Sequence, residues 1–109
     1  MSGSISTLAH HVYFWLKNPE SKADIAGLIR GVKTLTSIET IKSFHIATPA
    51  TTEDRNVIDN SYSVSWLAFF DSEANEQIYQ VHPTHLKFIE DHEHLWSKVV
   101  VYDSVQVAE

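Results

Sequence analysis

The residues best suited to chemistry in this sequence are its histidines, and two of them enclose a proline. The chain has seven histidines and no cysteine, which excludes a thiol nucleophile and a zinc–thiolate site. His82 and His85 lie on either side of Pro83, and Tyr79 precedes them. An imidazole serves as a general base near neutral pH, and a phenolic hydroxyl can support an oxyanion. By these properties His85 could act as a general base, and Tyr79, upstream of the proline, could support an oxyanion.

The setting of His85 favours this chemistry and also favours a structural role. Proline is common at the first position of a helix, so Pro83 predicts that His85 lies in a first helical turn. The positive end of the helix dipole disfavours an imidazolium there by about 0.3–1 kcal/mol, which favours the neutral form that a base requires. Alternatively, His85 begins the buried stripe of that helix, bonds a backbone carbonyl and fixes the helix junction.

Other histidines are candidates for the core or for a pocket wall. The proline that follows His82 disfavours helical geometry in it, so we expect His82 to end the preceding helix. His92 lies one stripe repeat beyond His85, in the core or in the wall of a pocket. His10 and His11 are neighbours on a predicted strand and point to opposite faces. Only one of these two can enter a pocket under the helices.

No metal or haem site is predicted from the histidine spacing. The pairs His82/His85 and His92/His94 lack the carboxylate or thiolate pattern of a zinc site, and nothing selects an axial haem ligand. His45 has no matched partner. We therefore predict no cofactor.

Length and composition bound the remaining possibilities. The 109 residues leave room for a single domain, with a core over about residues 8–107. The formal charge of −6 argues against nucleic acid or an anionic membrane as a partner. The apolar runs are too short to span a membrane, and residues 1–7 lack the pattern of a signal peptide. We therefore expect a cytoplasmic protein.

The elements that must position the candidate residues follow from hydrophobic periodicity. Alternation and helical spacing predict a strand at 8–16, a helix at 21–38, strands at 41–48 and 61–71, a short helix at 72–82, a helix from Pro83 and a strand at 99–107. This order is that of a ferredoxin-like βαββαβ subunit of the α+β class, with helices on one face of a four-stranded antiparallel sheet.

Two details of this arrangement concern glycines and a loop. Gly27 and Gly31 lie beside the apolar stripe of the first helix, where they would allow close packing on the sheet. Residues 50–60 form a long polar loop with Arg55 and Asp59, for which we expect a local ion pair or an Asx-turn. Closing over a pocket is the other reading of this loop.

The predicted sheet has large side chains on both faces, which indicates a partner. The first strand carries Leu8, Val12, Phe14 and Leu16 on one parity and His11, Tyr13 and Trp15 on the other. A four-stranded face covers roughly 350 Å², a size at which exposed apolar patches become unusual on monomers. We therefore expect a homodimer in which two sheets face each other.

Four segments resemble the Dabb (stress-responsive A/B-barrel) family of the dimeric α+β barrel superfamily. They are HHVYFWLK at 10–17, FHIATPA at 44–50, YQVHPTHLKF at 79–88 and LWSKVVVYD at 95–103. The resemblance implies a ferredoxin-like subunit in a dimeric α+β barrel. Many members of the family carry only a stress-response label, while a plant member is a polyketide cyclase that acts by intramolecular aldol condensation.

The resemblance also implies roles for particular residues. The cyclase's catalytic histidine corresponds to His85, its partner tyrosine to Tyr79, and a histidine on the first strand to His11. A further pocket histidine falls at Val64, which can neither donate nor accept a hydrogen bond. The polar end of the pocket is therefore poorer in this chain.

Three functions remain open, and the residues do not name a substrate. In the first, a homodimer binds a small apolar or aromatic molecule between helices and sheet. Its candidate ligand contacts are His11, Tyr13, Phe88, His92 and Trp96. In the second, the pocket belongs to a cofactor-free enzyme of the cyclase or monooxygenase kind, with His85 as base and Tyr79 as oxyanion support. In the third, the dimer is a purely structural stress-associated oligomer.

Overall fold

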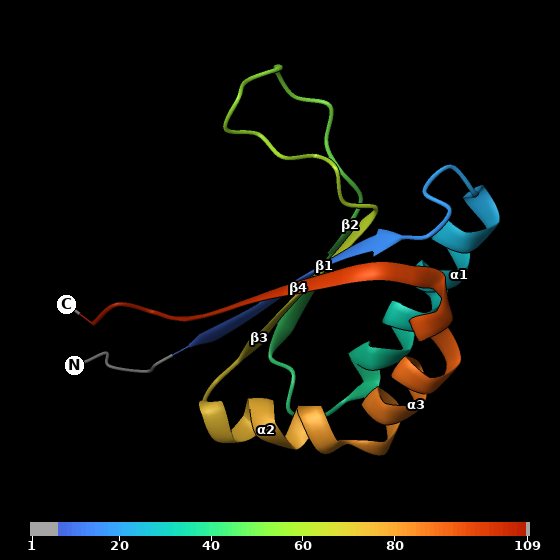
Figure 1. The fold of residues 1–109 in the computed structure, drawn as a ribbon. Coiled ribbons are helices and arrows are strands. Elements are labelled where there is room, and N and C mark those ends of the chain that lie inside the picture. The colour runs from blue at the N-terminus through green and yellow to red at the C-terminus, as the bar shows by residue number, and fades with distance from the viewer. Residues whose placement is uncertain (1–6, 109) are drawn as a thin grey trace.

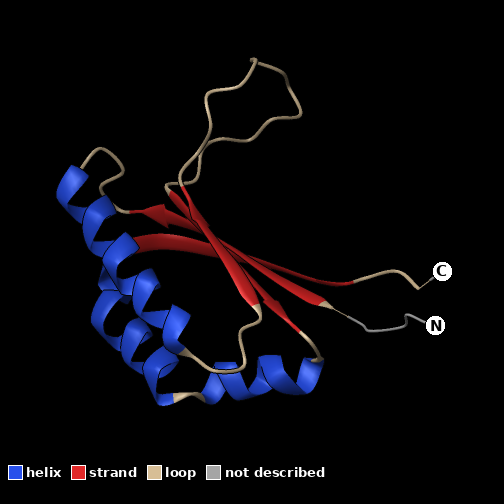
Figure 2. Ribbon diagram, turned by 180° about the vertical axis from the view of Figure 1, so that it is seen from behind, coloured by secondary structure: helices blue, strands red, loops and turns tan. Residues whose placement is uncertain are grey.

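The structure of the chain is a computed structural model that describes residues 7–108 in two layers. Its strands are β1 (Leu8–Leu16), β2 (Ser43–Ala47), β3 (Val64–Phe70) and β4 (Trp96–Val105), and its helices are α1 (Lys22–Thr34), α2 (Glu73–Val81) and α3 (Pro83–His92). The strands form one antiparallel sheet in the order β2-β3-β1-β4, and the helices cover one face of it (Figure 1). Figure 2 shows from behind how the helices gather on one side of the strands. The predicted ferredoxin-like α+β subunit is confirmed.

Strand β1 is central to the sheet because it pairs with both β3 and β4. Its residues alternate between buried and half-exposed along its whole length, with Val12 and Phe14 on the buried side. β-Branched and aromatic side chains of this kind suit a pleated surface that is packed on one face. His10 lies on the same buried side, opposite Ala68 of β3 and Asp103 of β4.

Local capping signals decide where α2 and α3 begin and end. The Ser72 hydroxyl accepts a hydrogen bond from the N–H of Asn75 at 3.1 Å and begins α2. His82 ends α2 in an extended conformation, and its Nδ1 accepts from the N–H of Thr84 at 3.1 Å to begin α3. Pro83 is the first residue of α3. The predicted break at His82 is confirmed.

The core fills the space between the helices and the buried face of the sheet. Its largest fully buried side chains are Trp66, Tyr79 and Phe70. Leu28 and Val32 of α1 are also fully buried, which confirms the apolar stripe predicted for that helix. No helix within residues 7–108 is long and apolar enough to cross a membrane.

Several boundaries differ from the prediction because tertiary contacts set them. Helix α3 ends at His92, and a 3-10 turn covers Glu93–Leu95 before β4 begins at Trp96. Trp96 pairs with Leu16 of β1, and the N–H of Lys17 donates to the carbonyl of Leu95 at 2.9 Å. This pairing begins β4 three residues before the predicted start at residue 99, and the strand ends at residue 105 rather than 107. Helix α1 and strand β2 are also shorter than predicted.

Gly31 allows close contact between α1 and α3. A Cβ atom at Gly31 would lie 2.5 Å from Nε2 of His92 in α3, which is closer than real side chains approach. At Gly27 the nearest such atom is Nη2 of Arg30 at 3.8 Å, an ordinary van der Waals distance. The closest approach at Gly31 is therefore to α3 and that at Gly27 is to its own helix, so neither contact supports the expected packing on the sheet.

The segment between β2 and β3 extends away from the two layers (Figure 1). Arg55 Nε pairs with Glu53 Oε1 at 3.0 Å. Asp59 Oδ1 accepts from the N–H of Ser61 at 2.9 Å. The predicted Asx-turn is thus present, while the alternative ion pair of Arg55 with Asp59 is replaced by the pair with Glu53.

The face of the sheet away from the helices carries aromatic rings in its middle. His11 and Tyr13 of β1 stack with centroids 4.3 Å apart, and Tyr62 meets Tyr13 edge-on at 4.9 Å. Leu67 of β3 stands between His11 and His45 of β2 in one row across the sheet. This face, hereafter the open face, is half-exposed at its centre in the single chain.

Candidate functional site

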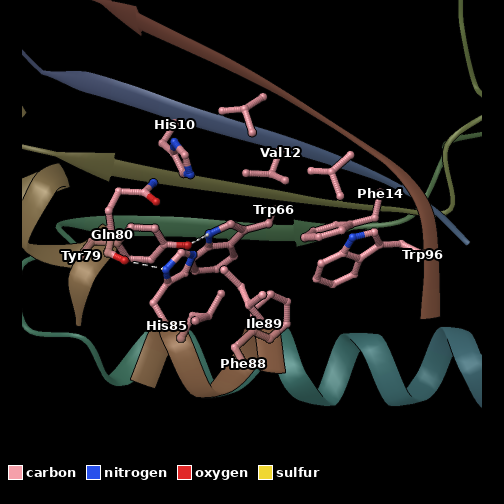
Figure 3. A pocket seen from close by; sticks show the side chains of 13 residues that line it. His10, Val12, Phe14, Trp66, Tyr79, Gln80, His85, Phe88, Ile89 and Trp96 are labelled. Atoms are coloured by element: carbon pink, nitrogen blue, oxygen red, sulfur yellow. Dashed lines mark hydrogen bonds between the residues drawn. The ribbon is translucent and has the colours of Figure 1, made fainter. Parts of the chain in front are cut away.

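A cavity of about 180 Å³ lies between the buried face of the sheet and the helices (Figure 3). Its apolar wall comprises Val12, Phe14, Leu35, Phe88, Ile89 and Trp96. Its polar end comprises His10, Trp66, Tyr79, Gln80 and His85. Val99 and Val101 of β4 complete the lining, and both are partly exposed to solvent. The cavity therefore has one polar end, an apolar body and a partly exposed edge at β4.

Tyr79 and Trp66 form the floor of the polar end. The indole Nε1 of Trp66 donates a hydrogen bond to the Tyr79 hydroxyl at 3.0 Å. Burial raises the pKa of the Tyr79 hydroxyl well above its ordinary value, although this hydrogen bond opposes the shift. Tyr79 therefore stays protonated, and its own O–H hydrogen is left to be donated to another group.

His85 lies beside Tyr79, with ring centroids 4.5 Å apart. Its Nδ1 is 3.0 Å from the carbonyl oxygen of Gln80. A carbonyl only accepts, so Nδ1 carries the hydrogen and Nε2 carries the lone pair of the neutral imidazole. This bond also satisfies one of the last carbonyls of α2, which have no partner within that helix. His85 thus fixes the helix junction and lines the cavity, so the two roles open at the sequence level are compatible.

The pKa of His85 lies below its ordinary value. Burial is the main cause, the hydrogen bond to Gln80 opposes the shift, and the neighbouring His10 imidazole lowers the pKa further. The neutral form of His85 is therefore favoured near pH 7, as a general base requires.

His10 is the second imidazole of the cavity, and sequence reasoning missed it. Its Nδ1 lies 2.6 Å from Oδ1 of Asp103 and 4.0 Å from Oε2 of Glu76. Its ring meets the ring of Tyr79 edge-on at 5.5 Å. Figure 3 shows His10 extending from β1 toward the rings of Tyr79 and His85.

The signal for His10 was present in the alternation of β1. His10 has the parity of Val12 and Phe14, which are buried under the helices, whereas His11 has the opposite parity. The resemblance pointed to His11, and that assignment of the pocket histidine is corrected. Asp103 carried no sequence signal, because only the register of β1 and β4 places it opposite His10.

The apolar body of the cavity is built from three rings. Phe14 lies 5.0 Å from Trp96 and 6.2 Å from Phe88 between centroids, and Phe88 lies 5.9 Å from Trp96. Phe88 and Trp96 were expected to line the pocket, and the structure places both there. Val64, which stands where the resemblance implies a further pocket histidine, is fully buried in the core.

Three other expected contacts lie outside the cavity. His11 and Tyr13 belong to the open face because their parity turns them away from the helices. Burial lowers the pKa of His11, and repulsion from His45 and His10 adds to the shift. His92 packs its ring against Gly31, and its Nδ1 donates to the carbonyl of Phe88 at 2.9 Å. His92 therefore serves the contact between α1 and α3.

The remaining histidines do not join the cavity. His82 caps α3, and its Nε2 lies 3.2 Å from Oε2 of Glu39. His45 and His94 are exposed. Within the described part of the chain, no group of three histidine, aspartate or glutamate side chains comes together as a metal site would require.

Comparisons with known proteins agree with this architecture. Residues 8–106 match the family model described as the stress responsive A/B barrel domain, Dabb. No curated protein matches the chain by sequence. A Dabb family protein with a ferredoxin-like fold from Mesorhizobium loti is 22% identical, with a TM-score of 0.77 over 94% of this chain and 99% of that one.

Two further solved structures are similar to the chain. A dimeric ferredoxin-like protein of unknown function from Thermobifida fusca is 16% identical, with a TM-score of 0.75 over 97% of this chain and 96% of that one. A hydroxynitrile lyase from Passiflora edulis is 21% identical, with a TM-score of 0.76 over 94% and 95% of the two chains. At these identities the likeness shows the fold alone.

Proposed function

Because the chain belongs to the stress responsive A/B barrel domain (Dabb) family, we propose that it is a homodimer in which each subunit binds one small aromatic molecule. The binding site is the cavity between the sheet and the helices. The observation that carries this proposal is the composition of that cavity, with three rings around its body and hydrogen-bonding groups at one end.

The size of the cavity supports a ligand of about one ring. An apolar protein cavity of about 150 Å³ stays dry and binds benzene, and the cavity here measures about 180 Å³. Drug-sized ligands occupy larger pockets, of roughly 300–1,000 Å³. A single aromatic ring with a small polar substituent fits both the volume and the placement of the polar end.

The open face supports the homodimer. Half-exposed His11, Tyr13 and Leu67 lie at the centre of a sheet whose other face is covered by helices. A sheet face of this kind gains by burying its apolar area against a second copy. The related protein from Thermobifida fusca is described as dimeric.

A titration with one-ring ligands tests the binding proposal. Toluene and benzaldehyde added to the 15N-labelled protein should shift the indole signal of Trp66 and the backbone signals around Tyr79. Val101→Trp should fill the cavity edge and abolish these shifts. Val105→Trp, on the same face of β4 and 52% exposed, is the matched control and should leave them unchanged. The proposal fails if neither ligand shifts these signals, or if the two variants behave alike.

A second candidate function is cofactor-free general-base catalysis in the same cavity. It is favoured by one observation, that the Gln80 carbonyl holds Nδ1 of His85 beside Tyr79, which leaves the lone pair of the neutral imidazole on Nε2. His85 would remove a proton from a bound hydroxyl or activated carbon, and the Tyr79 O–H would bond the developing carbonyl oxygen. The similar structure of a hydroxynitrile lyase makes aromatic hydroxynitriles the first compounds to assay.

Variants of His85 separate the enzyme from the binding protein. If catalysis operates, His85→Ala should abolish release of cyanide and aldehyde from an aromatic hydroxynitrile while toluene still binds. Turnover that survives His85→Ala would exclude His85 as the base. A wild-type protein that binds these ligands without turnover would exclude this catalysis and retain only the binding function.

A further inference from the structure

The strands of the open face carry two histidines and no carboxylate. In the four strands that the structure describes, the one acidic residue is Asp103, and it lies on the helix side, opposite His10. The chain as a whole has 14 acidic residues and a formal charge of −6, so the lack of carboxylates is a local property of this face. A histidine that takes up a proton here therefore has no carboxylate of the open face to pair with.

The neighbours of His11 on every strand beside it are neutral or basic. Leu67 of β3 lies opposite it on one side and Tyr102 of β4 on the other. His45 of β2 lies beyond Leu67. On β1 itself, the Tyr13 hydroxyl is 3.2 Å from Nδ1 of His11. None of these groups neutralises an imidazolium.

The charged groups at the ends of the strands do not supply the missing counter-charge. The Lys98 Nζ lies 4.6 Å from the centroid of the Trp15 ring and adds a positive charge to the open face. Asp71, after the end of β3, pairs with Lys42 at 3.3 Å. Asp59, before the start of β3, is engaged in the Asx-turn. Both carboxylates therefore have partners of their own.

The neutral form of His11 is favoured even in the single chain. Burial lowers its pKa, and repulsion from His45 and His10 adds to the shift. A second copy laid over the open face would remove more water from His11 and His45, and by two-fold symmetry would bring its own pair of imidazoles to the same contact. Because burying an unpaired charge is costly, such a contact tolerates neutral imidazoles and opposes protonated ones.

We propose that His11 and His45 make the homodimer sensitive to pH, so that it forms when the four imidazoles of two copies are neutral and separates when they take up protons. This inference rests on the proposed homodimer and adds the regulation of its interface. The separated chains bind more protons than the dimer, so acidification through the range in which histidine titrates favours the single chain.

Sedimentation velocity of the full chain at matched ionic strength measures this shift. An imidazole with the ordinary histidine pKa of about 6.5 is about 90% protonated at about pH 5.5. A dimer that must keep two such imidazoles neutral should therefore have a Kd about 100-fold higher at about pH 5.5 than at about pH 8. Returning the sample to the higher pH should restore the dimer. Circular dichroism at both pH values checks that the chain is folded.

Glutamine variants assign the effect to the open face. The double variant His11→Gln, His45→Gln keeps polar side chains and removes the titrating groups, so its Kd should change by less than about threefold between the two pH values. His94→Gln lies in the exposed turn before β4, outside the sheet. It is the matched control and should retain the full change.

A titration of the imidazole NMR signals tests the same linkage without a substitution. The pH at which His11 and His45 take up protons should fall as the protein concentration is raised from about 10 µM to about 1 mM, because the higher concentration favours the dimer. His94 should titrate at the same pH at both concentrations.

Each outcome decides a different statement. A dimer with the same Kd at both pH values overturns the regulation and leaves the homodimer standing. Dissociation that persists in the double variant, or titration of both imidazoles that is independent of concentration, overturns the role of His11 and His45. A folded wild-type monomer at both pH values overturns the proposed homodimer itself. If the double variant does not dimerise, or the wild-type chain unfolds in acid, the concentration dependence of the wild-type titration decides.

Discussion

The indole nitrogen of Trp66 donates to the hydroxyl of Tyr79 over 3.0 Å, and both side chains are 1% exposed. This bond ties the centre of β3 to the last turns of α2. It also turns the Tyr79 ring so that it contacts His10 and His85. The floor of the cavity is therefore held by a polar contact inside an otherwise apolar core, where partners cannot be exchanged for water.

Tyr79→Phe should destabilise the fold by about 1–3 kcal/mol, because it leaves the buried N–H of Trp66 without an acceptor. Urea unfolding followed by tryptophan fluorescence measures the change. Val81→Ala at the end of α2 is the control, since Val81 is 71% exposed, and it should change the free energy of unfolding by less than about 0.5 kcal/mol. Equal effects of the two substitutions would contradict the role given to this hydrogen bond.

The two helical glycines of α1 should respond oppositely to alanine. Gly27→Ala should stabilise the protein by about 0.5–1 kcal/mol, because alanine is the better helix former and its Cβ meets only an ordinary contact. Gly31→Ala should destabilise it by about 1–3 kcal/mol, because the new methyl overlaps the His92 ring.

Removing the ring should identify the cause of the Gly31 effect. The His92 ring cannot withdraw easily, since it is bonded to the Phe88 carbonyl and stacked on the Phe88 ring at 5.1 Å. In a His92→Ala background the penalty of Gly31→Ala should largely disappear. Thermal unfolding of the four combinations measures this coupling, and simple additivity would rule out the contact as the cause.

The stability of the protein should fall as the solution is acidified below about pH 6.5, the ordinary pKa of histidine. The pKa of His85 is lowered by burial in the folded state, so the unfolded chain binds more protons in the window between the two values. The loss of stability due to His85 ends once the pH is below the pKa of His85 in the folded protein. His11, whose pKa is also lowered, acts in the same direction.

Glutamine variants assign this pH dependence to residues. His85→Gln should flatten the fall in melting temperature between about pH 7.5 and pH 5, and His85→Gln with His11→Gln should flatten it further. His94→Gln, at an exposed position of the turn before β4, is the control and should leave the slope intact. A wild-type protein that gains stability on acidification would contradict the lowered pKa values of both histidines.

Leu67→Lys should separate the proposed homodimer into single chains. Leu67 lies at the centre of the open face between His11 and His45, so a lysine there would bury a charge in the contact between two sheets. Sedimentation velocity should show a shift toward a particle of 12.4 kDa. Leu86→Lys, at a position of α3 that is 54% exposed, is the control and should leave the sedimentation unchanged. A wild-type chain that sediments as a folded monomer would contradict the dimer.

The elements with local signals could be predicted from the sequence. The alternation of β1, the Ser72 cap of α2 and the break between His82 and Pro83 depend on residues close together in the chain, and the structure has all three. The start of β4 could not be predicted in this way, because it is set by the pairing of Trp96 with Leu16. The apolar pattern placed the start of this strand at residue 99, because over so short a run it does not distinguish a strand from the end of a helix.

In the candidate site, too, some contacts depend on residues close together in the chain and others on strand pairing. The juxtaposition of Tyr79 and His85 results from the helix break between them, and the resemblance selected both residues, with the predicted helix start at Pro83 as support for His85. The partner of His10 depends on strand register over a separation of 93 residues, which no spacing in the sequence reveals. The resemblance indicates His11 as the pocket histidine, whereas the parity of β1 indicates His10, and the structure agrees with the parity.

Successive residues of β1 lie in different environments: His10 lines the cavity, and its neighbour His11 lies on the open face of the sheet. A substitution at an even position of this strand changes the space available to a bound molecule and leaves the outer surface unaltered, and the reverse holds at an odd position. The proposed binding and the proposed self-association could therefore diverge separately among descendants of this fold, because they depend on alternate residues of one short strand.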